Sequence, residues 1–392
     1  MSQDSVTLAG VGDIILDRDE PETIFRHVAH VLRGADVTFA QIEQMYSEKG
    51  CPGTPQHTVT YSHPRLIPAL VFAGINVAGM AGNHTLDLGA PALIDTLDRL
   101  HAAGIATVGA GRDIAEAREP AIVERKRTRI AFLSYCTTGP KGYEADEGNA
   151  GFAPVRVSTL YEALEYQPGT PCQVITIPHQ EDLPAMVADI KKAKKENDVV
   201  VLSIHWGWHN VPILVAMYQQ AIGRAAIEAG ADLILGHHAH ILKGIEVYKG
   251  KTIFYSLGNF AIEFSPEKKQ QSKPTWRILM RKLYNFQPDP TYITYHFHPE
   301  SKATLIAKAV IADKKVQKVS YIPTYIGPRS EPELVACQDP RGQEVFNYVQ
   351  HITEKQNLNA VFEWDGDSEV IVRAGADEAE PIGPQLLRFA MP

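Results

Sequence analysis

Long apolar runs and targeting segments are missing from this sequence. No run of apolar residues approaches the roughly 20 that a membrane-spanning helix needs. Residues 1–13 contain no basic segment followed by an apolar one, so they predict no secretory signal. From these absences we expect a cytoplasmic protein without a membrane span.

Paired cysteines and an excess of positive charge are missing too. The net charge is −8 at pH 7, which argues against a nucleic-acid partner because proteins of that class normally present a basic face. The cysteines form no Cys-x-x-Cys pair, which argues against a disulfide framework and against a thiolate zinc site. Hydrophobic residues make up 44% and charged residues 21% of the 392 positions, a composition typical of a globular chain with a substantial core.

Strand-like and helix-like segments alternate along the first two-thirds of the chain. Short apolar runs such as 6–13, 36–43 and 75–84 predict strands, and amphipathic stretches such as 91–104 and 183–197 predict helices. Units of this length favour parallel strands joined by right-handed crossovers. The sequence therefore predicts an α/β fold, in which ligands bind beyond the carboxyl ends of the strands.

Residues 137–182 interrupt this alternation. They are rich in glycine, proline and polar residues and show no helical or strand periodicity. We interpret them as an insertion that borders the functional site, with Tyr143, Arg156 and Tyr161 as candidate substrate contacts. A surface insertion away from the site is the alternative interpretation.

The end of the chain has a different pattern. Segments after residue 290 alternate with period two and predict late antiparallel strands. We therefore expect one catalytic domain over residues 1–325, containing the insertion at 137–182. Residues 326–392 are expected to form a C-terminal extension that packs on this domain or is partly mobile.

Side chains that can bind metals or transfer protons follow five of the predicted strands. Because parallel strands end at one edge of a sheet, these side chains are expected to converge. Each residue alone also has a structural interpretation, as a capping carboxylate, a turn asparagine or a packed histidine. The residues are Asp13, Glu43, Asn83 with His84, His205, and the group His237, His238 and His240.

The mixture of carboxylate, amide and imidazole groups predicts a divalent metal site. Such a mixture suits Mn²⁺, Fe²⁺ or Zn²⁺, whereas Ca²⁺ prefers oxygen ligands alone. In the stretch "GHHAH", residues two apart share one face of an extended segment, so His238 and His240 can converge on one centre. His237 then points the other way, and we expect it to pack in the core or to lie behind the ligands.

Six short motifs, taken as an ordered set, resemble the CapA-type family, which is named for poly-γ-glutamate capsule synthesis. They are "GVGDIIL", "QIE", "AGNHTLDLG", "IHWGW", "GHHAH" and "YSLGNF", and they lie within residues 6–262. The fold of this family is similar to that of the calcineurin-like metallophosphoesterases. The resemblance implies a β-sandwich flanked by helices, with metal-binding loops at the strand ends. Residues 263–392 carry none of these motifs.

The resemblance also implies a role for each matched residue. Asp13 corresponds to a ligand of the first metal, and Glu43 to a bridging or metal-proximal carboxylate. Asn83 corresponds to a metal-bound amide, and His84 to a histidine that faces the substrate. One or two divalent ions (Mn, Zn or Fe) are implied, with ligands drawn from Asp13, Glu43, Asn83, His205, His238 and His240.

Three positions depart from the related patterns. Ile15 stands where the metallophosphoesterases have the histidine of an Asp-x-His motif, and Gln41 stands where the family has asparagine. His209 stands where the family commonly has glutamate. The missing ligand at Ile15 favours one firmly held ion, with a second held loosely, over a dinuclear phosphatase centre. We expect His209 to contact substrate, with metal binding as the alternative.

These features predict a metal-dependent hydrolase of amide or γ-glutamyl bonds. A metal-activated water would attack the carbonyl, with Glu43, His84 and His209 as the catalytic groups. The expected partner is a peptide or polyglutamate-like small substrate. Three alternatives are a peptide Cα epimerase, a phosphoesterase, and a non-catalytic partner in poly-γ-glutamate synthesis. The sequence does not predict the oligomeric state.

Overall fold

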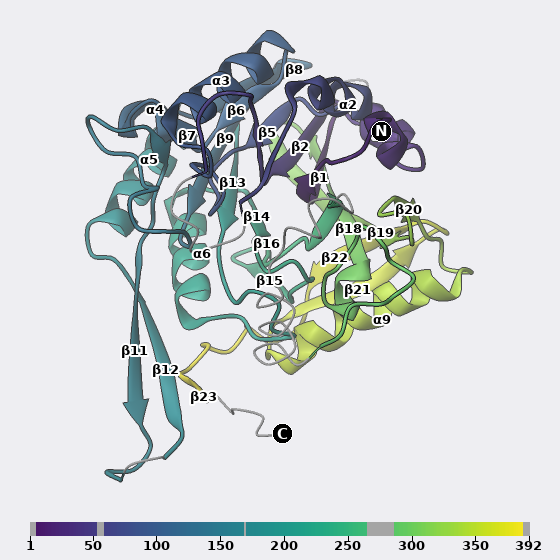
Figure 1. Cartoon of the computed structure of the whole chain (residues 1–392). Coiled ribbons are helices and arrows are strands. Elements are labelled where there is room, and N and C mark those ends of the chain that lie inside the picture. Colours follow the sequence, from purple (N-terminus) through teal and green to yellow (C-terminus); the bar gives the residue numbers. More distant parts are fainter. Residues whose placement is uncertain (1–4, 53–58, 168–169, 265–285, 387–392) are drawn as a thin grey trace.

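Two β-sheets pack face to face, and helices cover their outer faces (Figure 1). The computed structural model describes residues 5–52, 59–167, 170–264 and 286–386. This arrangement confirms the predicted α/β sandwich flanked by helices. In the described part of the chain, no helix is both long enough and apolar enough to span a membrane. The cytoplasmic location stays a prediction.

The larger sheet combines strands from both ends of the chain. Its order along the main path is β21 (Ala360–Asp365), β22 (Glu369–Ala374), β19 (Lys315–Ile326), β18 (Ala303–Ala312), β1 (Val6–Ile15), β2 (Val37–Ile42), β5 (Val77–Gly79) and β6 (Ala106–Val108). Two further strands join it, with β17 (Asn259–Ile262) beside β1 and β20 (Pro332–Leu334) beside β19. The pairs β1–β2, β2–β5 and β5–β6 are parallel, as predicted.

The smaller sheet comes from the middle of the chain. Its order is β15 (Ile245–Tyr248), β16 (Lys251–Phe254), β14 (Leu233–His237), β13 (Val199–His205), β9 (Thr128–Cys136) and β8 (Ala121–Arg125). The four strands from β9 to β16 pair in parallel, and antiparallel hairpins close both edges. The continuous apolar runs of β13 and β14 fit this place, because strands in a parallel sheet are covered on both faces.

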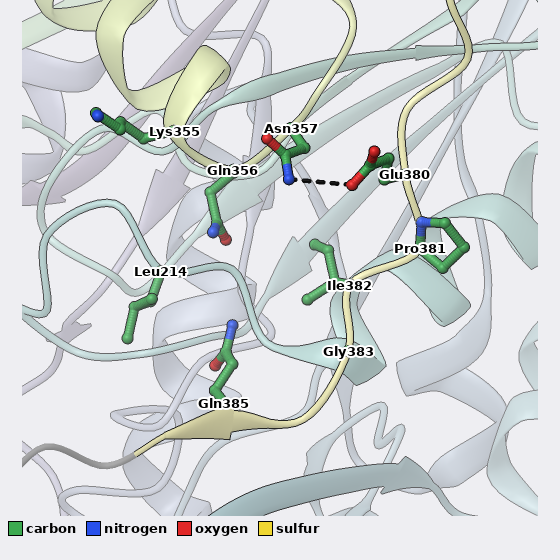
Figure 2. Close-up of a pocket in the computed structure, with 9 residues that line it drawn as sticks. All are labelled: Leu214, Lys355, Gln356, Asn357, Glu380, Pro381, Ile382, Gly383 and Gln385. Atoms are coloured by element: carbon green, nitrogen blue, oxygen red, sulfur yellow. Dashed lines mark hydrogen bonds between the residues drawn. The ribbon is translucent and has the colours of Figure 1, made fainter.

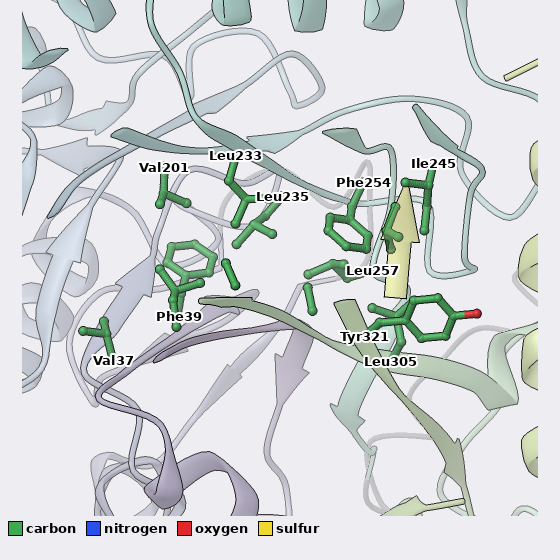
Figure 3. Close-up of a cluster of buried hydrophobic side chains, with 14 of the residues drawn as sticks. Val37, Phe39, Val201, Leu233, Leu235, Ile245, Phe254, Leu257, Leu305 and Tyr321 are labelled. Carbon is green, nitrogen blue, oxygen red and sulfur yellow. The ribbon is translucent and has the colours of Figure 1, made fainter. Parts of the chain in front are cut away.

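Side chains from the two sheets interdigitate in a common core (Figure 3). Val37 and Phe39 from β2 meet Val201, Leu233 and Leu235 from the smaller sheet. The ring of Phe39 also stacks on Phe132, with 5.9 Å between the ring centroids. Since both sheets depend on this core, it fixes the position of one set of strand ends relative to the other.

Helices cover the two outer faces. The larger sheet is covered by η1 (Pro21–Phe25), α1 (Ala29–Gly34), η2 (Pro64–Leu66), α2 (Ile67–Ala73) and α3 (Ala90–Ala102). The smaller sheet is covered by α4 (Ile114–Arg118), α5 (Asp182–Glu196) and α6 (Met217–Ala229). The last helix, α9 (Pro340–Lys355), places Val345, Val349 and Ile352 in the core between the sheets.

The remaining short elements lie outside the two main sheets. They are the pair β3 (Met45–Tyr46) and β4 (Tyr61–Ser62), the pair β7 (Ala110–Gly111) and β10 (Gly151–Phe152), and the 3₁₀ turn η3 (Pro299–Lys302). A three-stranded unit contains β11 (Val157–Ala163), β12 (Cys172–Pro178) and β23 (Gln385–Leu386). The β11–β12 hairpin extends from the body as a long arm (Figure 1).

This arm corrects the expectation that residues 137–182 have no regular structure. Strand β11 is exposed along most of its length on both faces, so its sequence lacks the apolar–polar alternation of a half-buried strand. Tyr161 lies on this arm and is 68% exposed. Arg156 pairs with Asp182, at 2.7 Å between the guanidinium and the carboxylate. Neither of these two predicted contacts borders the metal-capable residues.

Two other expectations also differ from the structure. Residues 293–298 form a loop rather than a strand. Tyr292 and Tyr295, three residues apart, pack in the same apolar cluster, whereas a strand would point them to opposite faces. Residues 212–230 have the spacing of an amphipathic helix, but the helix begins only at Met217. Residues 212–216 instead form a loop in which Ile213 has a φ of +65°.

Candidate metal centre

The predicted metal-capable residues meet where strands of both sheets end. Asp13 comes from β1 and Glu43 follows β2, so the larger sheet supplies the carboxylates. His205 ends β13, and the turn after β14 carries His238 and His240, so the smaller sheet supplies the imidazoles. All five side chains are buried. The packing of one sheet on the other therefore assembles the candidate centre.

A β-bulge turns Asp13 toward this centre. Strand β1 places Leu8 in the core between the sheets and Val11 under the outer helices. Regular alternation would put Asp13 on the same outer face as Val11. The register with β2 instead skips Gly12, which reverses the direction of the next side chain. A Cβ on Gly12 would lie 1.9 Å from the carbonyl oxygen of Gly258, so the bulge requires glycine.

Asp13 lies between histidines on both sides. Its Oδ2 accepts a hydrogen bond from the backbone N–H of His238 at 3.3 Å and lies 3.6 Å from Nδ1 of His240. Its Oδ1 lies 3.5 Å from Nδ1 of His237. Burial raises the pKa of Asp13, but the close approach of His237 and the charges of the surrounding histidines outweigh it, so the net shift is downward. The aspartate is therefore kept ionised.

Glu43 occupies the middle of the cluster. Its backbone N–H donates to the carbonyl oxygen of Ile14 at 3.1 Å, which anchors it beside Asp13. Its Oε1 lies 3.5 Å from Nε2 of His205 and 3.6 Å from Nε2 of His240. Burial, followed by the negative charges of Asp13 and Asp87, raises the pKa of Glu43 well above its ordinary value. A carboxylate in this position needs a positive partner to stay ionised.

The histidine turn has a strained backbone. His238 has a φ of +84° and His240 a φ of +58°, in the left-handed region that residues with a Cβ rarely adopt. Strain of this kind collects at functional sites. Nδ1 of His238 lies 3.1 Å from Nε2 of His205. Burial, followed by the neighbouring histidine charges, lowers the pKa of His238 well below its ordinary value. These imidazoles are therefore kept neutral, as metal ligands must be.

The loop after β5 adds an amide and a second histidine. Oδ1 of Asn83 lies 2.7 Å from Nε2 of His205. Nδ1 of His84 lies 2.7 Å from Oδ2 of Asp87, three residues further on. The charge of His84 contributes to lowering the pKa of His205 to about 3, after the larger effect of burial. His84 therefore lies close to the cluster, and Asp87 orients it.

The structure explains the residues found at positions 41 and 15, which depart from the related patterns. Gln41 is fully buried, and its Nε2 donates to the carbonyl oxygen of Ala81 at 2.9 Å. This bond supports the loop that carries Asn83 and His84. Ile15 packs in a separate apolar cluster with Ile262 and Tyr295, so that position supplies no ligand.

His209 lies on a loop above the histidine turn. Its ring centroid is 4.9 Å from that of His240 and 5.3 Å from that of His238. The backbone N–H of Asn210 donates to the carbonyl oxygen of Ala239 at 3.0 Å, which ties the loop to the turn. The structure therefore places His209 against two of the predicted ligands.

The C-terminal segment also holds this loop. Nε1 of Trp208 donates to Oε1 of Gln385 at 2.8 Å, and the backbone N–H of Val215 donates to Oε1 of Gln356 at 2.5 Å. A pocket lies between these segments (Figure 2), and its lining includes none of the carboxylates or histidines of the cluster. The candidate centre is thus a packed group of side chains distinct from this pocket.

Two residues near the cluster, Asp87 and Asn259, were not identified from the sequence. Asp87 lies inside the motif "AGNHTLDLG" and Asn259 inside "YSLGNF". Their positions within these motifs could have marked them as site residues. Tyr143 belongs to the 137–182 insertion, and burial and then the charge of Asp87 raise its pKa to about 12. Of the three predicted contacts in that insertion, Tyr143 alone lies beside the site. His237, expected to pack or to lie behind the ligands, faces Asp13 and Phe39.

The donor atoms fit a divalent cation. Two groups of three residues each bring their ligand atoms within 4.8 Å of one another, and Glu43 belongs to both. Three of these buried atoms have no hydrogen-bond partner among the described residues, namely Oδ1 of Asp13 and both carboxylate oxygens of Glu43. Buried polar atoms without a partner are costly unless something else satisfies them. The two groups are Glu43 with His205 and His238, and Asp13 with Glu43 and His240.

Several known proteins are similar in sequence to this chain. An uncharacterized protein, y4sH, of Sinorhizobium fredii is 30% identical over 309 residues, covering 66% of both chains. The PGA biosynthesis protein CapA of Bacillus subtilis is 28% identical over 274 residues, covering 67% of this chain and 64% of the relative. A probable polyglutamine synthesis accessory protein of Mycobacterium tuberculosis is 31% identical over 229 residues, covering 58% of this chain and 55% of the relative. The chain thus spans about two-thirds or less of the length of these relatives.

A solved structure and a family model complete the comparison. The calcineurin-like phosphoesterase YfkN from Bacillus subtilis matches with a TM-score of 0.41 and 13% identity, covering 90% of this chain and 98% of that chain. A likeness this distant carries no argument about chemistry. The family model described as bacterial capsule synthesis protein PGA_cap matches residues 7–263. This match, over well more than half of the sequence, shows that the chain belongs to the PGA_cap family of capsule synthesis proteins, as its motifs predicted.

Proposed function

We propose that this protein is a divalent-metal-dependent enzyme that hydrolyses an amide bond in a peptide or γ-glutamyl substrate. The observation that carries the proposal is the buried cluster of two carboxylates and three histidines, in which several donor atoms have no hydrogen-bond partner in the part of the chain that the structure describes. A structural core gains nothing from such a cluster, because unpaired buried charges and donors destabilise the fold.

The ligands form two overlapping sets. One set is Glu43, His205 and His238, and the other is Asp13, Glu43 and His240. Because Glu43 belongs to both sets, either set could hold a single ion or each set could hold one, with Mn²⁺, Zn²⁺ or Fe²⁺ as candidates. A bound ion would supply Lewis-acid chemistry, polarising a carbonyl oxygen and making water more acidic.

Acid–base groups stand beside these ligands. Asp87 holds Nδ1 of His84 at 2.7 Å, which is how a carboxylate orients a catalytic imidazole. His209 stands against the rings of His238 and His240 and is assigned to substrate contact. In this proposal His84 moves the proton between water and the leaving amine, and His209 positions the substrate.

The substrate class rests on the relatives. Their names refer to PGA biosynthesis and to polyglutamine synthesis, which favours a polymer of glutamate-type units joined through amide bonds. The proposal therefore names γ-glutamyl oligomers as the substrates to test first.

The test combines metal content with product release. Protein purified without a histidine tag is analysed for bound metal, stripped with chelator, and reloaded separately with Mn²⁺, Zn²⁺ and Fe²⁺. Free amine released from γ-glutamyl oligomers is then measured. We expect turnover only in the loaded protein, and none after joint substitution His238→Ala and His240→Ala. His30→Ala, which removes an exposed histidine, is the matched control and should retain full activity.

Other outcomes distinguish the alternatives. Deuterium uptake from heavy water into a peptide without cleavage would indicate an epimerase, and cleavage of p-nitrophenyl phosphate would indicate a phosphoesterase. A protein that binds no metal and turns over none of these substrates would contradict an enzymatic role. It would instead favour the accessory role named for the mycobacterial relative.

A further inference from the structure

A chain of buried hydrogen bonds connects the candidate centre to the C-terminal part of the molecule. Nδ1 of His240 lies 2.7 Å from Oδ1 of Asn259. Nδ2 of the same asparagine donates to the hydroxyl oxygen of Tyr295 at 2.8 Å. That hydroxyl lies 2.8 Å from the carbonyl oxygen of Ser301 and 2.9 Å from its Oγ. Each of these side chains is at most 5% exposed, so water does not compete for the bonds.

The chain of bonds has one direction. A carbonyl oxygen only accepts, and Oγ of Ser301 gives its own proton to the carbonyl oxygen of His298 at 2.5 Å. Tyr295 therefore donates its hydroxyl proton to Ser301. The hydroxyl oxygen of Tyr295 must then accept a hydrogen bond from Asn259. This fixes the asparagine amide with its nitrogen toward Tyr295 and its oxygen toward His240.

The orientation of Asn259 in turn determines which nitrogen of His240 carries the proton. An amide oxygen only accepts, so Nδ1 of the neutral imidazole must donate to it. Nε2 then keeps its lone pair, and this nitrogen lies 3.6 Å from Oε1 of Glu43. In the other tautomer, an N–H would point at the cluster and no lone pair would be available there.

We infer that Asn259 and Tyr295 are positioning residues that select the metal-binding tautomer of His240. This inference rests on the proposed metal-dependent function. A partner on the second ring nitrogen commonly fixes the tautomer of a ligand histidine, and its loss weakens metal binding by roughly 10- to 100-fold.

The backbone and packing hold the two residues in place. Asn259 pairs directly with Asp13 in the β1–β17 register, so the same strand pair carries a proposed ligand and the residue that orients another. The ring of Phe297 fills the space between Tyr295 and His240, with centroid distances of 5.0 Å and 4.9 Å. Tyr295 and Phe297 lie beyond residues 7–263. The C-terminal part of the chain thus contributes side chains to the site that lie outside the residues matched by the family model.

The test compares two variants, each of which lacks the hydroxyl group of one buried tyrosine. Tyr295→Phe deletes the group that orients Asn259. Tyr292→Phe deletes a hydroxyl in the same aromatic cluster, which bonds instead to the carbonyl oxygen of Ile326 at 3.0 Å. Histidine ¹⁵N–¹H correlation spectra of the metal-free proteins report the tautomer, with the His240 signals assigned by their loss in His240→Ala. Titration with Zn²⁺ alone reports affinity.

We expect His240 to carry its proton on Nδ1 in the unsubstituted protein and in Tyr292→Phe. Tyr295→Phe should populate the other tautomer and weaken Zn²⁺ binding by roughly 10-fold. Asn259→Asp, which keeps an accepting oxygen, should preserve the tautomer, and Asn259→Leu should lose it.

The two proposals fail in different ways. If the unsubstituted protein binds no Zn²⁺, the metal-dependent function fails, while the metal-free spectra still decide the tautomer. If Tyr295→Phe matches Tyr292→Phe in both spectrum and affinity, or if His240 carries its proton on Nε2 in the unsubstituted protein, the positioning role is overturned.

Discussion

Lys243 is a buried lysine three residues after the last histidine of the turn. It is 2% exposed, and its Nζ donates to the carbonyl oxygen of Val211, in the loop that carries His209. Burial lowers the pKa of Lys243 from 10.5 to about 7, although the charge of Glu300 acts in the opposite direction. This lysine therefore links the histidine turn to the loop that carries His209. Its burial lowers the stability of the folded protein by an amount that depends on pH.

The sign of that dependence follows from the two pKa values. The unfolded chain holds this proton up to its ordinary pKa of 10.5, whereas the folded protein releases it near pH 7. Between these values the unfolded state binds more protons, so this group makes folding more favourable as the pH rises. As the pH rises through this window, the free energy of unfolding of the natural protein should increase relative to that of Lys243→Met. The increase should be at most about 1.4 kcal/mol per pH unit.

Urea unfolding at several pH values within the window measures this difference. Lys141→Met, at an exposed position, is the control and should leave the pH dependence unchanged. A constant difference between the natural protein and Lys243→Met over the whole window would show that the folded lysine keeps its proton.

At the scale of single elements, the bulge in β1 has the clearest consequence for the site. It turns Asp13 from the face covered by helices to the face between the sheets, and it brings Gly12 against the carbonyl group of Gly258. A methyl group at position 12 cannot fit there without separating β1 from the turn before β17. Placement of Asp13 therefore depends on the absence of a side chain one residue earlier.

Gly12→Ala tests this dependence. We expect a loss of more than about 2 kcal/mol in the free energy of unfolding, together with weaker Zn²⁺ binding because Asp13 is displaced. Gly34→Ala is the matched control, because a Cβ there meets no atom within 4 Å, and its stability should change by no more than about 1 kcal/mol. Denaturant unfolding and metal titration measure both effects. Equal behaviour of the two variants would contradict the proposed need for glycine at position 12.

At the scale of the whole molecule, the C-terminal strands are built into the larger sheet. Strand β18 pairs with β1, β19 pairs with β18, and β22 pairs with β19. Helix α9 packs its apolar residues into the core between the two sheets. Because the same core supports elements from both ends of the chain, we propose that the two main sheets and helix α9 unfold as one unit, so that the C-terminal strands are part of it.

Tryptophan fluorescence can test this cooperativity. Trp206 lies buried behind the smaller sheet, whereas Trp364 in β21 stacks on Phe346 with 5.5 Å between the ring centroids. Variants in which Trp206 or Trp364 is the sole remaining tryptophan of the four should unfold at the same urea concentration, as expected for a two-state transition. An earlier transition reported by Trp364 alone would show that the C-terminal strands form a separate domain.

The class of fold, the family and the residues expected at the centre follow from the amino-acid sequence alone. Apolar runs ending in Asp, Glu or His are local features, and the rule that parallel strands end at one edge brings them together without knowledge of the packing. The structure accordingly places Asp13, Glu43, Asn83, His205, His238 and His240 in one cluster.

How these residues contact one another depends on the packing of the folded chain. The bulge at Gly12, the contact of His237 with Asp13 and the bond from Asn259 to Tyr295 each depend on segments that are distant in sequence. The β11–β12 arm was missed for a related reason, because a strand exposed on both faces shows no alternation. Local periodicity records which face of an element is buried, but it does not record which element covers that face, and the chemistry of this site depends on the latter.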